Sequence, residues 1–115
     1  MPRRPKKKTG KHAPDHTFEV PLYGSTISVF LRDTPLDGAQ AWCFEGAVPN
    51  SYGVVLQRDA GAGIIAHEAA HLSRWICSAL ALDPDPDNDE VFAYLLQFLT
   101  DQLSEICADP TDPLT

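Results

Sequence analysis

Two histidines and a glutamate lie within five residues of each other, as His67-Glu68-Ala69-Ala70-His71. His67 and His71 are four positions apart, so on an α-helix both imidazoles project from one face and can hold one metal ion. A zinc ion lowers the pKa of a bound water towards neutrality, and the adjacent carboxylate of Glu68 can take that proton and deliver it to a leaving amine. The pattern predicts a site for one Zn²⁺ ion, with Glu68 as the catalytic base and acid in peptide or amide hydrolysis.

The chain around this motif has the pattern of a buried helix. From about Gly63 to Leu82 there is no proline, and the apolar side chains share one stripe: Ile65, Ala69, Leu72, Ile76, Ala79 and Leu80. These apolar neighbours argue against the alternative, a solvated His-Glu-His patch on an ordinary helix. The prolines at 84 and 86 end the helix. A second helix is expected after them, capped by Asp87 or Asn88, with a stripe of Phe92, Leu95, Leu96, Leu99, Leu103 and Ile106.

The first half of the chain alternates with a period of two, which predicts paired strands around the glycine turn at Tyr23-Gly24. Further strands are expected over 41–45 and 52–57. The sequence therefore predicts an α+β domain over residues 17–109, with a small three- to four-stranded sheet followed by the motif helix and a second helix. Residues 1–16 are expected to be a flexible basic tail, and 110–115 a polar end.

The formal net charge of −7 hides two parts of opposite sign. Six of the nine basic residues lie in the first eleven positions, so residues 12–115 hold 3 basic against 16 acidic side chains. Such an acidic body repels phosphates, so nucleic acid or an acidic partner would have to bind the tail. No apolar run is long enough for a membrane helix or a signal peptide, and three widely spaced cysteines fit reduced thiols. We expect a cytoplasmic protein that does not enter the membrane.

The motif, together with Asn88-Asp89-Glu90 running into Ala93-Tyr94-Leu95, resembles minimal zincin metallopeptidases, in particular small zincins encoded by bacteriophages and prophages. The resemblance covers residues 52–107. It implies one Zn²⁺ ion, a peptide or protein substrate, and a site of action inside a bacterial host cell. In glutamate-type zincins the third metal ligand is a glutamate about twenty residues after the second histidine, which implies that Glu90 is the third ligand. The family tends to have an aspartate four residues later, where this chain has Tyr94.

The third ligand has alternatives. Glu90 lies about 160° from the centre of the second helix's apolar stripe, so as a ligand it must face the first helix in an interface shared with Ala93, Tyr94 and Gln97. Asp89, at the flank of the stripe, is the alternative carboxylate. Peptide deformylases combine the same motif with a cysteine from a Glu-Gly-Cys segment. Because Cys43-Phe44-Glu45-Gly46 has these residues in another order, we expect Cys43 to be a buried strand residue.

The remaining histidines, His12 and His16, belong to the expected tail, so the donor that stabilises an oxyanion has to come from elsewhere. Tyr94 is the candidate catalytic residue for this role, and the other candidates are Tyr52, Arg74 and Tyr23. Zincins bind an extended peptide along an edge strand beside the active helix, and 52–57 is the nearest strand by sequence. The rival hypothesis is a non-catalytic phage-type interaction protein with a structural metal, which binds a host protein or nucleic acid. Such a site would not need Glu68.

Overall fold

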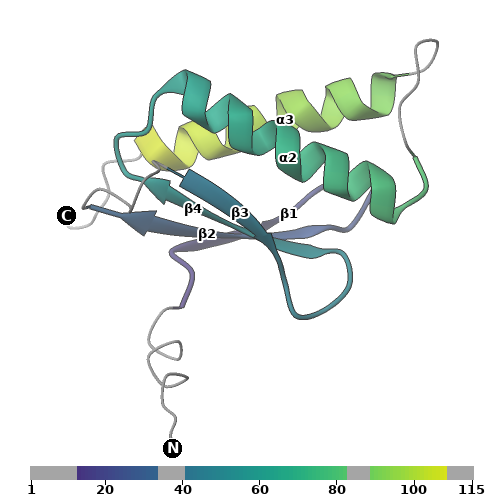
Figure 1. Ribbon diagram of the computed structural model, residues 1–115, viewed down its shortest axis with the longest axis horizontal. Helices are drawn as coiled ribbons and strands as arrows, with labels where there is room; N and C mark the ends of the chain where they lie inside the picture. The colour runs from purple at the N-terminus through teal and green to yellow at the C-terminus, as the bar shows by residue number, and fades with distance from the viewer. Residues whose placement is uncertain (1–12, 34–40, 83–88, 109–115) are drawn as a thin grey trace, which may run out of the picture.

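The computed structural model describes residues 13–33, 41–82 and 89–108. These residues form four strands followed by two helices: β1 (His16–Glu19), β2 (Thr26–Arg32), β3 (Ala41–Glu45), β4 (Ser51–Gln57), α2 (Ala62–Ala79) and α3 (Glu90–Ala108). The expected α+β class, with four strands and two helices, is confirmed (Figure 1). The basic residues of the tail, the helix caps proposed at Asp87 and Asn88, and the polar end at 110–115 lie outside the described residues.

The four strands form one sheet in the order β1-β2-β4-β3. β1 and β2 pair antiparallel, β3 and β4 pair antiparallel, and β2 and β4 lie parallel at the centre. The prediction that 52–57 is an edge strand is wrong, because β4 is hydrogen-bonded to β2 on one side and to β3 on the other. The edge strand on that side of the sheet is β3.

The β1–β2 hairpin includes the glycine turn that the sequence predicts. Gly24 has a φ of 69°, in the left-handed region that glycine adopts without steric cost, and its N–H donates to the carbonyl of Val20. The sheet also begins one residue before the expected domain start, at His16. Just before it, the Asp15 carboxylate accepts a hydrogen bond of 2.7 Å from the Leu31 N–H, so the hydrogen bonding of β2 continues past the end of β1.

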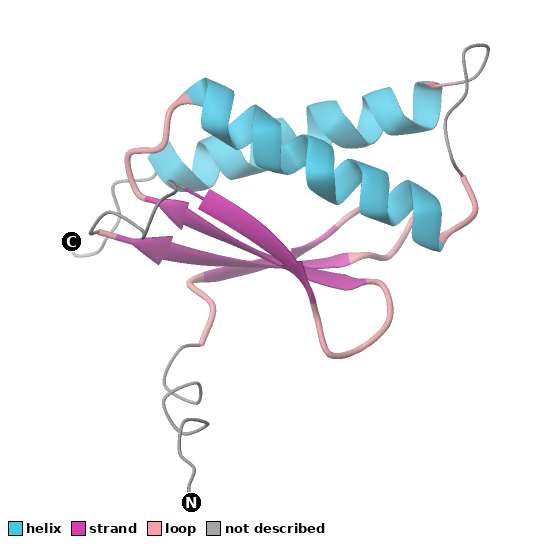
Figure 2. Cartoon of the chain, viewed as in Figure 1, coloured by secondary structure: helices cyan, strands magenta, loops and turns pink. Residues whose placement is uncertain are grey.

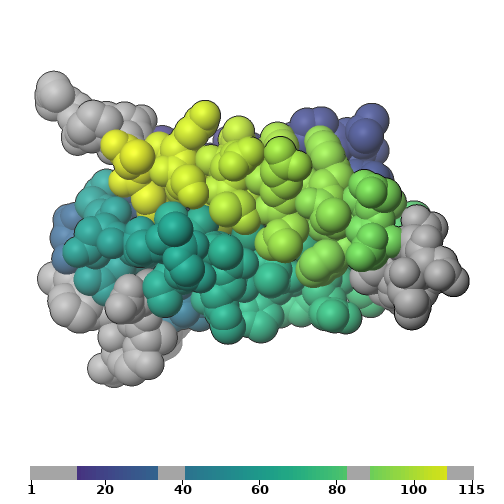
Figure 3. All heavy atoms as spheres, turned by 90° about the horizontal axis from the view of Figure 1, so that it is seen from above, coloured from purple at the N-terminus to yellow at the C-terminus, as the bar shows by residue number. Residues whose placement is uncertain are grey.

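Both helices cover the same face of the sheet, and none of the described elements covers the other face (Figures 1 and 2). Seen from above, α2 and α3 lie side by side over the strands (Figure 3). The core between the layers comes from the inward side chains of β2 and β4 and from one stripe of each helix: Ile27, Val29, Val54, Leu56, Ile65, Ala69, Leu72, Ile76, Leu95, Leu99 and Leu103. The predicted stripes are thus confirmed at their centres. No helix in the described ranges is long and apolar enough to cross a bilayer.

The opposite face of α3 is open to solvent. Glu90, Ala93 and Gln97 are exposed, and Tyr94 retains 37% of its accessible surface. The expectation that these four residues form a second interface with the first helix is therefore wrong. Because α2 and α3 lie side by side on the sheet, one continuous apolar face of α3 contacts both α2 and the sheet. The opposite side of α3 faces water.

Candidate metal centre

Helix α2 positions the three motif residues through its buried stripe. Ile65 and Leu72, at 3% and 0% exposure, hold one side of the helix against the sheet. Glu68 lies on that same side, three residues after Ile65, and is itself only 5% exposed. His67 and His71 sit on the adjacent, solvent-exposed side of the helix. The rotation of α2 about its axis therefore directs the carboxylate inward and leaves both imidazoles at the surface beside it.

The two imidazoles converge on one another. The Nε2 atoms of His67 and His71 are 3.2 Å apart, and the ring planes are nearly perpendicular, with 83° between them. Two nitrogens bound to a tetrahedral zinc ion at 2.0–2.1 Å are separated by about 3.3–3.4 Å, the edge of that tetrahedron. The observed spacing is that of a hydrogen bond between the two rings, and it also lies close to this edge length, so the pair fits a zinc ion held through both Nε2 atoms.

A pocket of about 280 Å³ opens at this point between helix α2 and strand β3. Its walls are Ala41, Trp42, Cys43, His67, Glu68, His71 and Trp75. Trp75 follows His71 by one helical turn on α2, with the two ring centroids 6.4 Å apart, and Tyr52 stacks on the Trp75 indole with ring centroids 6.1 Å apart. The pocket thus combines a possible metal site with an aromatic wall.

Cys43 contacts the buried carboxylate across the pocket. Its thiol donates a hydrogen bond of 3.0 Å to Oε1 of Glu68, and Sγ lies 3.5 Å from the Glu68 carbonyl oxygen. Burial raises the pKa of the Cys43 thiol far above its usual range, and the hydrogen bond to Glu68 and the negative charge of Glu68 raise it further. The thiol is therefore protonated in this arrangement, and the carboxylate has a hydrogen-bond donor instead of a cation as its partner.

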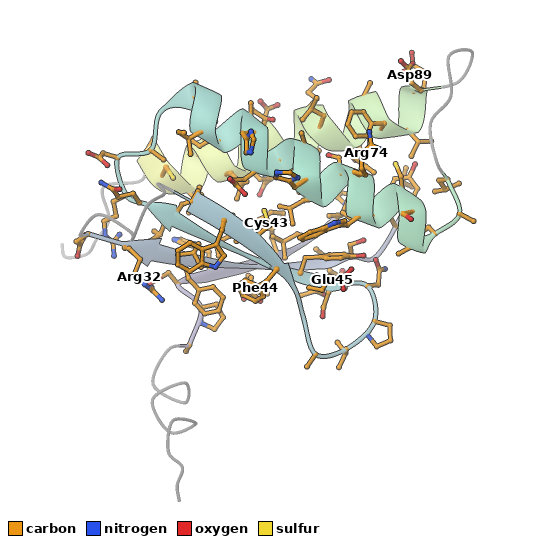
Figure 4. All side chains as sticks on the ribbon, viewed as in Figure 1. Arg32, Cys43, Phe44, Glu45, Arg74 and Asp89 are labelled. Atoms are coloured by element: carbon orange, nitrogen blue, oxygen red, sulfur yellow. The ribbon has the colours of Figure 1, made fainter. Side chains whose placement is uncertain are left out.

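The structure does not bring the carboxylates of the second helix to this pocket. The eight residues from His71 to Ala79 extend α2 by about 12 Å. Only after the turn does α3 begin, at Glu90, and it runs back antiparallel to α2 (Figure 1). Figure 4 shows Asp89 at the N-terminal end of α3 and Cys43 midway along β3, beneath α2. Glu90, next to Asp89, is exposed and is absent from the pocket wall.

The candidate oxyanion donors also lie apart from the two histidines. The Tyr94 and Phe98 rings stack with centroids 6.2 Å apart, and the Tyr94 and Tyr23 ring centroids are 6.3 Å apart. Both tyrosines therefore belong to one aromatic cluster beside the turn between β1 and β2. Tyr52 stacks on Trp75, and Arg74 is exposed on α2 (Figure 4). None of the four lines the pocket.

Sequence reasoning missed that Cys43 belongs to this site. The signal was present in the alternation of β3. Trp42 and Phe44 are exposed, Phe44 lies below the sheet and away from the helices (Figure 4), and the period of two then turns Cys43 towards the helices. Local sequence does not show, however, that β3 is the strand beside the motif. Within the described ranges no group of three or more His, Cys, Asp or Glu side chains is arranged so that it could hold a metal ion.

Comparisons of the chain with protein-family models, with curated proteins and with solved structures found no match.

Proposed function

We propose that this protein is a zinc-dependent hydrolase of peptide or amide bonds, similar in its chemistry to zincin metallopeptidases. The observation that carries the proposal is the 3.2 Å separation of the His67 and His71 Nε2 atoms at a pocket whose wall includes the buried carboxylate of Glu68. His67 and His71 would hold the ion. A zinc ion there would supply Lewis acidity, which polarises a scissile carbonyl and acidifies a water.

Glu68 is the proton carrier in this proposal. Its Oε1 atom faces the pocket and accepts a hydrogen bond from the Cys43 thiol there. A water that replaced this donor could give its proton to the same oxygen as it attacks the carbonyl carbon. The same oxygen then returns the proton to the leaving nitrogen, and the carboxylate is regenerated. Burial of the side chain favours this role, because few waters compete for the carboxylate.

Strand β3 is the proposed guide for the substrate. It is the outer strand next to β4 in the described sheet, and its residues Ala41, Trp42 and Cys43 form one wall of the pocket. An extended peptide added along the open side of β3 would gain backbone hydrogen bonds without strong sequence selectivity. It would also place a peptide bond beside the two histidines. This strand takes the role that the sequence assigned to 52–57.

The test compares the wild type with Glu68→Gln, which keeps the size of the side chain and removes its basicity. Cleavage of a defined mixture of unstructured peptides is followed by mass spectrometry, with zinc content measured on the same samples. We expect kcat/KM to fall by about 10²–10⁴-fold while one zinc ion stays bound. Glu105→Gln, an exposed glutamate of α3, is the matched control and should keep full activity.

Two outcomes would contradict the proposal. Unchanged cleavage by Glu68→Gln with zinc bound would remove the assigned base. A wild-type protein that binds zinc and cleaves none of the peptides or simple amides would favour the rival hypothesis of a non-catalytic binding protein with a structural metal.

A further inference from the structure

Two histidines leave a catalytic zinc site one protein ligand short, because such sites use three and keep the fourth position open. The pocket wall limits the choice of the third. Among the described residues of the wall, the side chains with metal-binding atoms besides His67 and His71 are those of Cys43 and Glu68, since the remaining described members are alanine and tryptophan. If Glu68 carries the proton, Cys43 is the donor that remains.

The position of Cys43 is set by the sheet and not by a loop. It lies in the middle of β3, paired with Val54 of the neighbouring strand, whose side chain is fully buried. Trp42 and Phe44 on either side of it are exposed, and the alternation of β3 turns Cys43 between them towards α2. The thiol reaches Glu68 itself, at 3.0 Å from its carboxylate and 3.5 Å from its backbone carbonyl oxygen, so it lies at the level of the motif along the helix.

We propose that Sγ of Cys43 is the third protein ligand of the metal ion held by His67 and His71. The inference rests on the proposed metal site but not on the identity of the substrate. A thiolate with two imidazoles is a donor set that zinc accepts in catalytic sites. The Sγ–H bond breaks as the Sγ–metal bond forms, and the proton passes through the Glu68 carboxylate to solvent, with no change in oxidation state.

This ligand would also link metal binding to the state of Glu68. A thiol that has lost its proton can no longer donate a hydrogen bond to Oε1 of the carboxylate. As they stand, His67, His71 and Cys43 do not form a group that could hold a metal ion, so Sγ would have to leave Glu68 and turn about its Cα–Cβ bond towards the imidazoles. Metal binding would therefore remove the hydrogen bond from the Cys43 thiol to Glu68, and the carboxylate would become available to a water. Binding of the metal would therefore bring in the third ligand and free the Glu68 carboxylate at the same time.

The test is X-ray absorption spectroscopy of the zinc-saturated protein. We expect a sulfur shell at about 2.3 Å beside nitrogen and oxygen at about 2.0–2.1 Å. Cys43→Ser should lose the sulfur shell, and its zinc affinity in competition with a chelator should fall by more than the 10–100-fold typical of losing an outer partner of a ligand. Cys107→Ser, at the end of α3 and outside the pocket wall, is the matched control and should keep both.

A second measurement on the wild type covers the case in which Cys43→Ser does not fold. Zinc-saturated and chelator-stripped samples are alkylated for the same time and mapped by mass spectrometry. Zinc should protect Cys43 and leave the labelling of Cys107 unchanged. One bound zinc with no sulfur shell, or a sulfur shell that persists in Cys43→Ser, would overturn the inference and leave the proposed function standing. A wild type that binds no metal would overturn both.

Discussion

The burial of Leu72 provides a test of how α2 is rotated about its axis. Leu72 follows His71 directly and is fully buried, so it anchors the side of the helix that faces the sheet. Shortening such a leucine to alanine costs about 2.7–5.0 kcal/mol, the sum of lost apolar transfer and the cavity left behind. Against a total stability of about 5–15 kcal/mol for a protein of this kind, Leu72→Ala is a large loss. It should lower Tm by at least about 10 °C.

The assay is urea unfolding with a chelator present, so that bound metal adds nothing to the stability of either protein. We expect a lower midpoint for Leu72→Ala with an unchanged slope. Leu22→Ala is the matched control, because Leu22 is 88% exposed and its loss should change the free energy of unfolding by less than about 0.5 kcal/mol. A cost below about 1 kcal/mol for Leu72→Ala would refute this rotation of α2. The placement of His67 and His71 beside the pocket depends on that rotation, so it would be wrong as well.

Three further perturbations have expected outcomes. In chelator-stripped protein, Cys43 should be alkylated slowly at pH 8, because its raised thiol pKa leaves little thiolate. Alkylation should be several-fold faster in Glu68→Gln, because the loss of the negative charge lowers that pKa. Equal alkylation rates in the two proteins, measured by mass spectrometry, would contradict this prediction. Ser25→Ala removes a buried hydroxyl that donates to Oδ1 of Asn50 at 2.7 Å and should cost about 1–3 kcal/mol in urea unfolding, whereas a cost near zero would show that the bond is absent. Zinc at a hundred times its Kd should stabilise the wild type by about 2.7 kcal/mol in thermal unfolding, and a shift of equal size in a variant without the two histidines would place the ion elsewhere.

The features of the fold that depend on local periodicity were predictable. Leu72 and Ile76 on α2, and Leu99 on α3, are buried because a repeat of 3.6 residues puts them on one stripe whatever lies opposite. Val29 in β2 follows from the repeat of two in the same way. These periods specify which side of each helix or strand is apolar, and the hydrophobic effect buries that side in the core.

The order of the strands was not predictable from such signals. Nothing local in Ser51–Gln57 shows that it pairs in parallel with β2 and so becomes an inner strand. Because β3 then takes the outer position next to α2, Cys43 comes to lie against Glu68, although 25 residues separate them in sequence. The spacing of nineteen between His71 and Glu90 was similarly uninformative, since it does not reveal that α2 continues to Ala79 before the chain turns.

The central claim, that His67 and His71 hold a metal ion, is tested most directly by the metal content of protein purified without added metal. Elemental analysis should find one zinc ion per chain in the wild type and none in the double variant His67→Ala/His71→Ala. His16→Ala, which alters a histidine of β1 outside the pocket wall, should retain the ion. Zinc well below one equivalent in the wild type, with thermal stability unaffected by chelation, would contradict the account, as would equal zinc in the double variant.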